Sequence, residues 1–233
     1  MQNLEGLKRW LKDGISENSL MLHGTSIETV FELTNTGKIP TGILEIGDDY
    51  IYDRIQNRLF FSPVSSRFKG KKYERLAHMN KDDCFEDAKT YASFAGFINC
   101  LAYELNCQIA ETYTILRHWE NGSIGWEEIQ TGLQKHGIEL SIEKIIELHE
   151  NARKRKGVII EPNELILELP HEVAEDDNMA ICVECPEGLD KRYVNGIELL
   201  GPVEERLMRR FLDGKLEYKG FKAELPEEYQ YLY

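Results

Sequence analysis

The chain has 233 residues, of which 42% are hydrophobic and 30% are charged, and its formal net charge is −13. This length suits one large domain or one domain with an insertion. No stretch approaches the roughly 20 consecutive apolar residues of a membrane-spanning helix, so we expect no membrane association. The N-terminus does not resemble a secretory signal, and the five cysteines lack the spacing of a disulfide framework, so we expect a cytoplasmic protein.

The first part of the chain alternates helix and strand signals. Leucines at helical spacing predict an amphipathic helix over residues 3–13, and residues 19–23 have the pattern of a strand. Ser26 is placed to cap a helix that ends at Gly37, since serine favours helix N-termini and glycine favours the position after the last turn. Leu59-Phe60-Phe61 then predicts a short strand.

Residues 64–82 are polar and without periodicity, which predicts a long loop. The loop carries a basic cluster made of Arg67, Lys69, Lys71, Lys72 and Arg75. We interpret the cluster as a solvated charged loop, which is the usual role of such a run, and the acidic chain as a whole disfavours binding to phosphates. A local recognition surface for a nucleic acid is the alternative.

The middle of the chain is helical, and its last third has the pattern of strands. Helices are expected over residues 85–118, 126–135 and 142–156, with the basic run 153–156 closing the third. Strands are expected over 158–160, 165–169, 180–183 and 193–200, followed by a helix over 203–212. Because strands at both ends must pair, we predict one α+β domain over residues 1–233 with a helical insertion at about 97–156.

Two segments have the residue types of a ligand-binding site. His23-Gly24-Thr25 ends a predicted strand, where the histidine supplies a hydrogen-bonding group and the glycine permits close backbone approach. Tyr91 lies on the first turns of a predicted helix between small alanines, so its ring could stack on a flat heterocycle.

Together, these segments resemble a known family. His-Gly-Thr after a strand, an aromatic strand ending in Ser62, and then Ala88-x-x-Tyr91-Ala92 is similar to the ADP-ribosyltransferases of the diphtheria-toxin type. The poly(ADP-ribose) polymerases, the rifamycin ADP-ribosyltransferases and the RNA 2′-phosphotransferases belong to that group. The resemblance covers about residues 19–95 and, in part, 158–203, and it implies a split antiparallel β-sheet that binds NAD as a substrate.

The resemblance also implies residue roles. His23 would hydrogen-bond the adenosine ribose of NAD, the backbone of Gly24 would hold the nicotinamide amide, and Tyr91 would stack on the nicotinamide ring. Thr25 and Ser62 would line the pocket. Phe60 takes a position where the family usually has tyrosine, which keeps the aromatic stacking and loses the phenol's hydrogen bond.

The third member of the family's His–Tyr–Glu set would be a glutamate on a late strand. Glu198 suits this role best, because alternation separates it from Ile197 and Leu199, and Glu164 is its main rival. A carboxylate stabilises the oxocarbenium-like state that forms when the bond between ribose and nicotinamide breaks, and this chemistry needs no metal.

The function that the resemblance implies is mono-ADP-ribosyl transfer to a protein or nucleic acid, with release of nicotinamide. By family analogy, a chain of this size is typical of a bacterial or phage effector, such as a toxin with an antitoxin partner. The alternative is a non-catalytic protein that binds a nucleotide or a partner on the same fold. RNA 2′-phosphotransfer would need a convergent set of basic residues, and the sequence does not indicate one.

Cys182 and Cys185 have the spacing of a zinc half-site or a redox pair. A structural zinc site needs two further ligands, and no second close pair is present, so we interpret both cysteines as packing residues. The acidic and aromatic segment 217–233 would dock on the domain or bind a partner, and the sequence favours neither.

Overall fold

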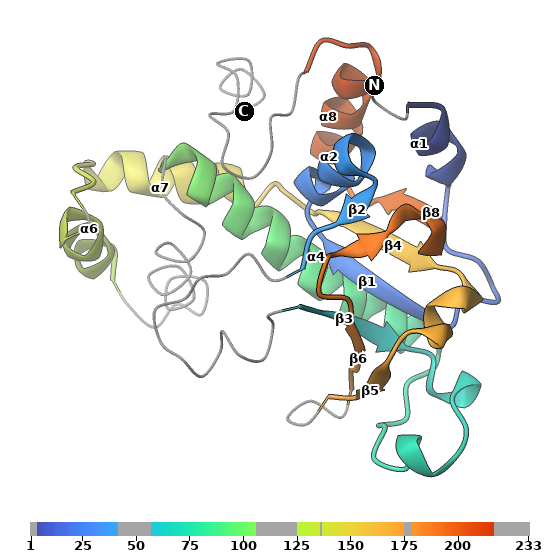
Figure 1. The fold of residues 1–233 in the computed structure, drawn as a ribbon. Helices are drawn as coiled ribbons and strands as arrows, with labels where there is room; N and C mark the ends of the chain where they lie inside the picture. Colours follow the sequence, from blue (N-terminus) through green and yellow to red (C-terminus); the bar gives the residue numbers. More distant parts are fainter. Residues whose placement is uncertain (1–3, 42–56, 106–124, 136, 175–178, 217–233) are drawn as a thin grey trace.

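The computed structural model of the chain describes residues 4–41, 57–105, 125–135, 137–174 and 179–216. A six-stranded antiparallel sheet with the strand order β5-β6-β3-β1-β4-β8 forms its centre (Figure 1). The strands are β1 (Met21–Thr25), β3 (Arg58–Pro63), β4 (Val158–Pro162), β5 (His171–Val173), β6 (Ile181–Glu184) and β8 (Val194–Leu199). A second, two-stranded sheet joins β2 (Lys38–Ile39) to β7 (Leu189–Asp190). The predicted α+β class is confirmed.

Strand β1 changes its pairing partner along its length. In the register of the described residues, Met21 and Leu22 pair with β3, whereas His23, Gly24 and Thr25 pair with β4. Beyond Leu22, β3 continues as a pair with β6 instead. The ladder between β1 and β3 is therefore short, and His23 is the first residue of β1 after it ends.

Helices cover both faces of the sheet. The helices are α1 (Leu4–Trp10), α2 (Ile27–Thr36), α4 (Lys81–Glu104), α6 (Trp126–Lys135), α7 (Ile142–Ala152) and α8 (Pro202–Leu212). Met21 and Ile197 face the main core, which also holds Leu7 of α1 and the stacked rings of Phe31 and Phe211 from α2 and α8. On the other face, Leu22 and Ile159 pack against the first half of α4 in a cluster with Cys84 and Ala88.

Helix α2 begins and ends at the residues that the sequence predicts, directly after Ser26 and directly before Gly37. Ser26 is the N-cap residue, although its hydroxyl makes no capping hydrogen bond. Gly37 follows the last turn with φ +80°, a left-handed conformation that glycine adopts without steric cost, and its N–H donates to the carbonyl of Leu33. The sequence Thr25-Ser26 therefore turns the chain from β1 directly into α2.

Helix α4 lies unusually close to β1. A Cβ atom placed on Gly24 would lie 1.9 Å from the carbonyl oxygen of Ala88, and one placed on Gly157 would lie 2.2 Å from that of Ala92. Both alanines are fully buried. Two glycines on the sheet side and two alanines on the helix side thus allow backbone-to-backbone contact, which larger side chains would prevent.

Helix α4 continues past the sheet to α6 and α7 (Figure 1). The second half of α4 forms a separate hydrophobic cluster with these helices, in which Leu101, Ile129, Leu133, Ile145 and Leu148 are buried. This cluster occupies the region predicted as a helical insertion. Part of the helical segment expected over 85–118 lies outside the described residues.

Two sequence predictions in this part are wrong. Helix α7 ends at Ala152, so the basic run after it does not close the helix. Instead, Arg155 is buried and forms ion pairs with Glu28 of α2 and Glu204 of α8, with N–O distances of 2.8 and 2.9 Å. Residues 165–169 do not form a strand, because Asn163 caps a 3₁₀ helix, Glu164–Glu168, by accepting a hydrogen bond from the N–H of Leu165.

The contact between α4 and β1 predicts that Gly24→Ala is strongly destabilising. The added methyl group would collide with backbone atoms that cannot move independently. Overpacking of this kind lowers the free energy of unfolding by about 1–3 kcal/mol, and a collision with backbone atoms is expected at or above the upper end of that range. Gly125→Ala is the matched control, since a Cβ there would meet only a side-chain oxygen of Glu127 at 3.4 Å. Urea unfolding of both variants measures the difference, and equal stabilities would contradict the close contact.

Candidate functional site

His23 lies at the point where β1 and β3 part. Its Nδ1 atom is 2.8 Å from the backbone carbonyl oxygen of Phe60, and its ring centroid is 5.3 Å from that of Phe61. A carbonyl oxygen only accepts, so Nδ1 carries the hydrogen and donates it. The imidazole thus takes over the link between the two strands after the backbone ladder has ended.

The protonation state of His23 follows from this position. Burial lowers the pKa of His23 below its ordinary value, and the hydrogen bond to the Phe60 carbonyl opposes this shift without cancelling it. The neutral ring with hydrogen on Nδ1 therefore predominates at pH 7, and it leaves Nε2 as a hydrogen-bond acceptor. Such an atom can accept from a ligand hydroxyl.

A second polar contact joins β3 to α4. The hydroxyl of Ser62 donates to Oδ2 of Asp87 at 2.6 Å, and the thiol of Cys84 donates to the carbonyl of Ser62. Tyr91 is four residues after Asp87, so both lie on the same flank of α4. Tyr91 as a whole residue is 46% exposed. This flank of the helix faces the β3 side of the sheet.

The structure places five of the predicted residues on β1, β3 and α4, but their side chains do not share one face of the sheet. The His23 ring lies beside Phe61 on the face away from α4, whereas the Ser62 hydroxyl and Tyr91 are on the α4 side. His23, Gly24 and Phe60 lie on or beside the parting of β1 from β3, and Ser62 and Tyr91 lie along the adjoining flank of α4. Ser62 is buried against Asp87, so its hydroxyl already has a partner. Phe60 packs against Cys182 and the alanines near β6.

Thr25 is placed differently from the prediction. Its side chain is buried, and its hydroxyl is 2.8 Å from that of Thr29 on α2. Thr25 therefore fixes the turn from β1 into α2, because its hydroxyl hydrogen-bonds a residue of that helix instead of being presented to a ligand.

The structure does not bring Glu198 to His23. Glu198 pairs with Ile159 of β4, which in turn pairs with Gly24, so Glu198 is two strands from β1. It shares the α4 face with Gly24, whereas His23 alternates to the other face. Burial raises the pKa of Glu198, and Lys89 opposes this shift. Lys89 comes two positions after Asp87, and two positions correspond to a rotation of about 200° around the helix axis. Lys89 therefore lies on the flank of α4 away from Asp87.

The placement of Glu198 has a consequence for its predicted catalytic role. The alternation that separates Glu198 from Ile197 is confirmed, but the role itself stays a prediction that this position does not favour. The rival Glu164 is exposed on the 3₁₀ helix after β4. The carboxylate that the structure does place on the Tyr91 flank is Asp87, which sequence reasoning missed. Its spacing of four residues before Tyr91 was the available signal.

Cys182 and Cys185 are buried packing residues, as expected. Burial raises the pKa of Cys182 to about 11 and that of Cys185 to about 12, so both thiols are protonated at neutral pH. Among the described residues, no group of three or more His, Cys, Asp or Glu side chains could hold a metal ion. Within the same residues, no helix is both long and apolar enough to cross a lipid bilayer.

Comparisons of this chain with protein-family models, with curated proteins and with solved structures returned no match.

The state of His23 predicts a measurable titration. Because its folded pKa is lowered, the unfolded chain binds more protons as the pH falls below about 6.5, so acidification costs stability through this residue. Imidazole signals in NMR spectra should show His23 titrating below the ordinary pKa of histidine. The loss of stability between about pH 7.5 and pH 5.5 should be smaller in His23→Gln. A folded pKa at or above the ordinary value would contradict this environment.

The buried thiols predict resistance to alkylation. Iodoacetamide reacts with thiolates, so Cys84, Cys182 and Cys185 should remain unmodified in the native protein at about pH 8. The same residues should react fully in guanidinium chloride, which is the control. Peptide mapping by mass spectrometry reads each site separately. Rapid native modification of Cys182 or Cys185 would show that this pair is reactive instead.

Proposed function

We propose that the protein is an NAD-dependent mono-ADP-ribosyltransferase that transfers ADP-ribose to a macromolecular acceptor and releases nicotinamide. The observation that carries the proposal is the position of His23-Gly24-Thr25. This segment lies where β1 parts from β3, and the helix with Tyr91 is pressed against Gly24. The split antiparallel sheet of the ADP-ribosyltransferases is the arrangement that this register supports.

The chemistry of His23 supports the role proposed for it. Neutral His23, with Nδ1 donating to Phe60, offers Nε2 to a hydroxyl of the adenosine ribose. At Gly24, within the described residues, the pairing of β1 with β3 has already ended, and we assign the Gly24 backbone to the nicotinamide amide. Tyr91, exposed one turn beyond Ala88, supplies an aromatic face for the nicotinamide ring.

The proposed reaction breaks the bond between C1′ of the ribose and the nicotinamide nitrogen. The bond electrons leave with neutral nicotinamide, and a nucleophile of the acceptor forms the new bond to C1′ and loses its proton. Positive charge develops on the ribose as the bond breaks, so a carboxylate near C1′ would lower the barrier. On the flank of Tyr91 this carboxylate is Asp87, held by Ser62.

A non-catalytic nucleotide- or partner-binding protein is the second candidate. The observation in its favour is the separation of Glu198 from His23, since a fold without a carboxylate near C1′ would bind NAD and not split it. An antitoxin partner and a toxic role stay part of the transferase proposal by family resemblance alone.

Release of nicotinamide from NAD by the purified protein tests the proposal. His23→Ala should mainly raise KM, because it removes a ribose contact that is present before and during the reaction. Asp87→Asn keeps an acceptor for the hydroxyl of Ser62 and removes the charge, so kcat should fall by about 10²–10³-fold. Glu198→Gln should have the smaller effect if the carboxylate role belongs to Asp87.

The control for these variants is Glu205→Gln, an exposed glutamate of α8 that should leave both constants unchanged. If Glu198→Gln lowers kcat and Asp87→Asn does not, the original prediction for Glu198 is correct and the role of Asp87 is wrong. NAD that binds without any release of nicotinamide would favour the binding protein over the transferase.

A further inference from the structure

The segment between β3 and α4 is a closed loop with its own fixed structure. We refer to residues 64–80 as the basic loop. Its two ends are joined at Ser65 and Met79, where the backbone N–H of Ser65 donates to the Met79 carbonyl at 3.0 Å and the Ser65 hydroxyl accepts from the Met79 N–H at 3.0 Å. A loop with joined ends that packs on its own side chains is an Ω-loop, a type that is frequently functional.

The apolar side chains of the basic loop face the protein. Phe68 is buried in the main core, and Tyr73 and Leu76 pack against that core. The Tyr73 hydroxyl is 2.7 Å from Nε2 of His171 on β5, and Nδ1 of His171 donates to the Leu169 carbonyl. These contacts hold the loop against the edge strand of the sheet.

The charged side chains of the basic loop face the solvent. Residues 64–80 contain five Lys or Arg and one Glu, a net charge of +4 in a chain whose total is −13. Lys69, Lys71 and Arg75 are exposed and form no ion pair within the part of the chain that the structure describes. The Nζ atom of Lys72 is fixed 2.8 Å from Nε2 of His171.

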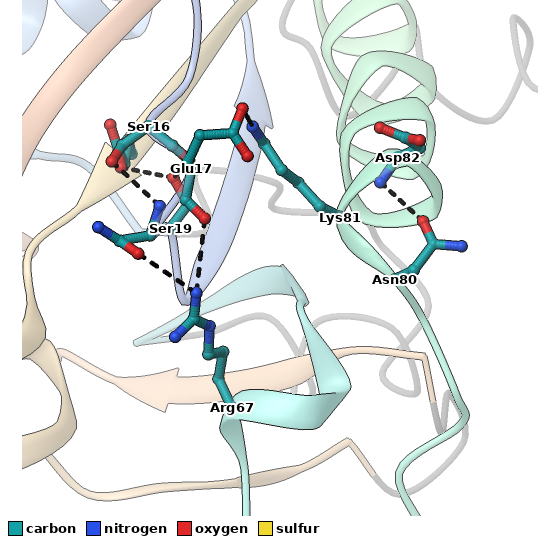
Figure 2. Close-up of polar contacts among 9 residues, drawn as sticks. Ser16, Glu17, Ser19, Arg67, Asn80, Lys81 and Asp82 are labelled. Atoms are coloured by element: carbon teal, nitrogen blue, oxygen red, sulfur yellow. Dashed lines mark hydrogen bonds and ion pairs between the residues drawn. The ribbon is translucent and has the colours of Figure 1, made fainter.

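Two cations near the ends of the basic loop, Arg67 within it and Lys81 directly after it, contact the segment before β1. Figure 2 shows Arg67 approaching the carbonyl of Glu17, and Lys81 forming an ion pair with the side chain of Glu17. The Lys81–Glu17 distance is 2.6 Å, and Arg67 also lies 3.5 Å from the side-chain oxygen of Asn18. These contacts tie both ends of the loop to the turn before β1. Arg67 keeps its positive charge, because both of its partners are neutral, but its guanidinium is held against this turn. Lys69, Lys71, Lys72 and Arg75 are the remaining cations of the basic loop.

We propose that the basic loop is a docking surface for the phosphate backbone of a nucleic acid. Closely spaced cations on a preorganised loop match the repeated charges of phosphates, and a fixed loop loses little conformational freedom on binding. A membrane surface would favour apolar side chains that insert beside the cations, whereas Phe68, Leu76 and Met79 face inward. This proposal departs from our sequence-based interpretation of the cluster as a solvated charged loop.

The basic loop also has a defined relation to the candidate site. It joins β3, which carries Phe60 and Ser62, to α4, which carries Asp87 and Tyr91. Tyr91 is ten residues after Lys81, which is about 15 Å along the helix. Resting on the proposed function, this geometry makes the docked nucleic acid the acceptor of ADP-ribose. The docking itself does not depend on NAD cleavage.

Fluorescence anisotropy with a labelled single-stranded oligonucleotide, without NAD, tests the docking. The variant K69Q/K71Q/R75Q removes three cations from the loop, and R206Q/R209Q/K215Q removes three exposed or partly exposed cations on or just after α8 as the control. Loss of three phosphate contacts should reduce the slope of log K against log salt by about 2. If the two proteins bind equally at about 1 M salt, the loop variant should bind about 100-fold more weakly than the wild type at about 0.1 M salt.

The outcomes separate docking from catalysis. An unchanged salt slope in the loop variant, or an equal loss in the α8 variant, overturns the docking surface. Competition by polyglutamate as effective as that by unlabelled oligonucleotide overturns a nucleic acid in favour of an acidic protein. Nicotinamide release without an acceptor should be equal in the loop variant and the wild type. If no nicotinamide is released and the loop still binds the oligonucleotide, the proposed function fails and the docking surface stands.

Discussion

The contact between the backbones of β1 and α4 is the constraint on which the rest of the structure depends. Gly24 and Gly157 let the strand and the start of β4 approach Ala88 and Ala92 more closely than any side chain would permit. Because this contact fixes the rotation of α4 about its own axis, it decides which helix residues face β3 and which face β8. Asp87 and Tyr91 are on the first side, and Lys89 is on the second.

The same helix joins two hydrophobic clusters that are otherwise separate. Its first half packs on the sheet with Leu22 and Ile159, and its second half packs on α6 and α7. Where the chain returns to the sheet, Arg155 pairs with Glu28 and Glu204, two buried carboxylates from different helices. Loss of one partner in such a buried set leaves an uncompensated charge, which costs about 3–5 kcal/mol, so the return point is well determined.

Local sequence signals predicted the elements whose causes are local. Ser26 and Gly37 correctly mark the two ends of α2, and the strand that carries Ser62 and the helix that carries Tyr91 were found where their patterns indicated. The 3₁₀ helix after Asn163 was missed, because a short apolar run has the same pattern in a strand as in a buried turn.

What sequence could not supply was the register between distant strands. Alternation correctly placed Glu198 and Ile197 on different faces of the strand. Only the pairing of β8 with β4, and of β4 with β1, shows that Glu198 is two strands away from His23. The hydrogen bond between Ser62 and Asp87 depends on the same non-local packing, as does the role of Arg155. The positions of His23, Gly24 and Tyr91 on their strand and helix were therefore predictable, whereas the packing of Thr25 and the position of the carboxylate were not.

The most direct test of the account is a crystal structure with an NAD analogue whose ribose–nicotinamide bond cannot be cleaved. The account predicts the adenosine ribose within hydrogen-bond distance of Nε2 of His23, and the nicotinamide between the backbone of Gly24 and the ring of Tyr91. An analogue bound elsewhere on the protein, or a saturated crystal with nothing at the parting of β1 and β3, would contradict it.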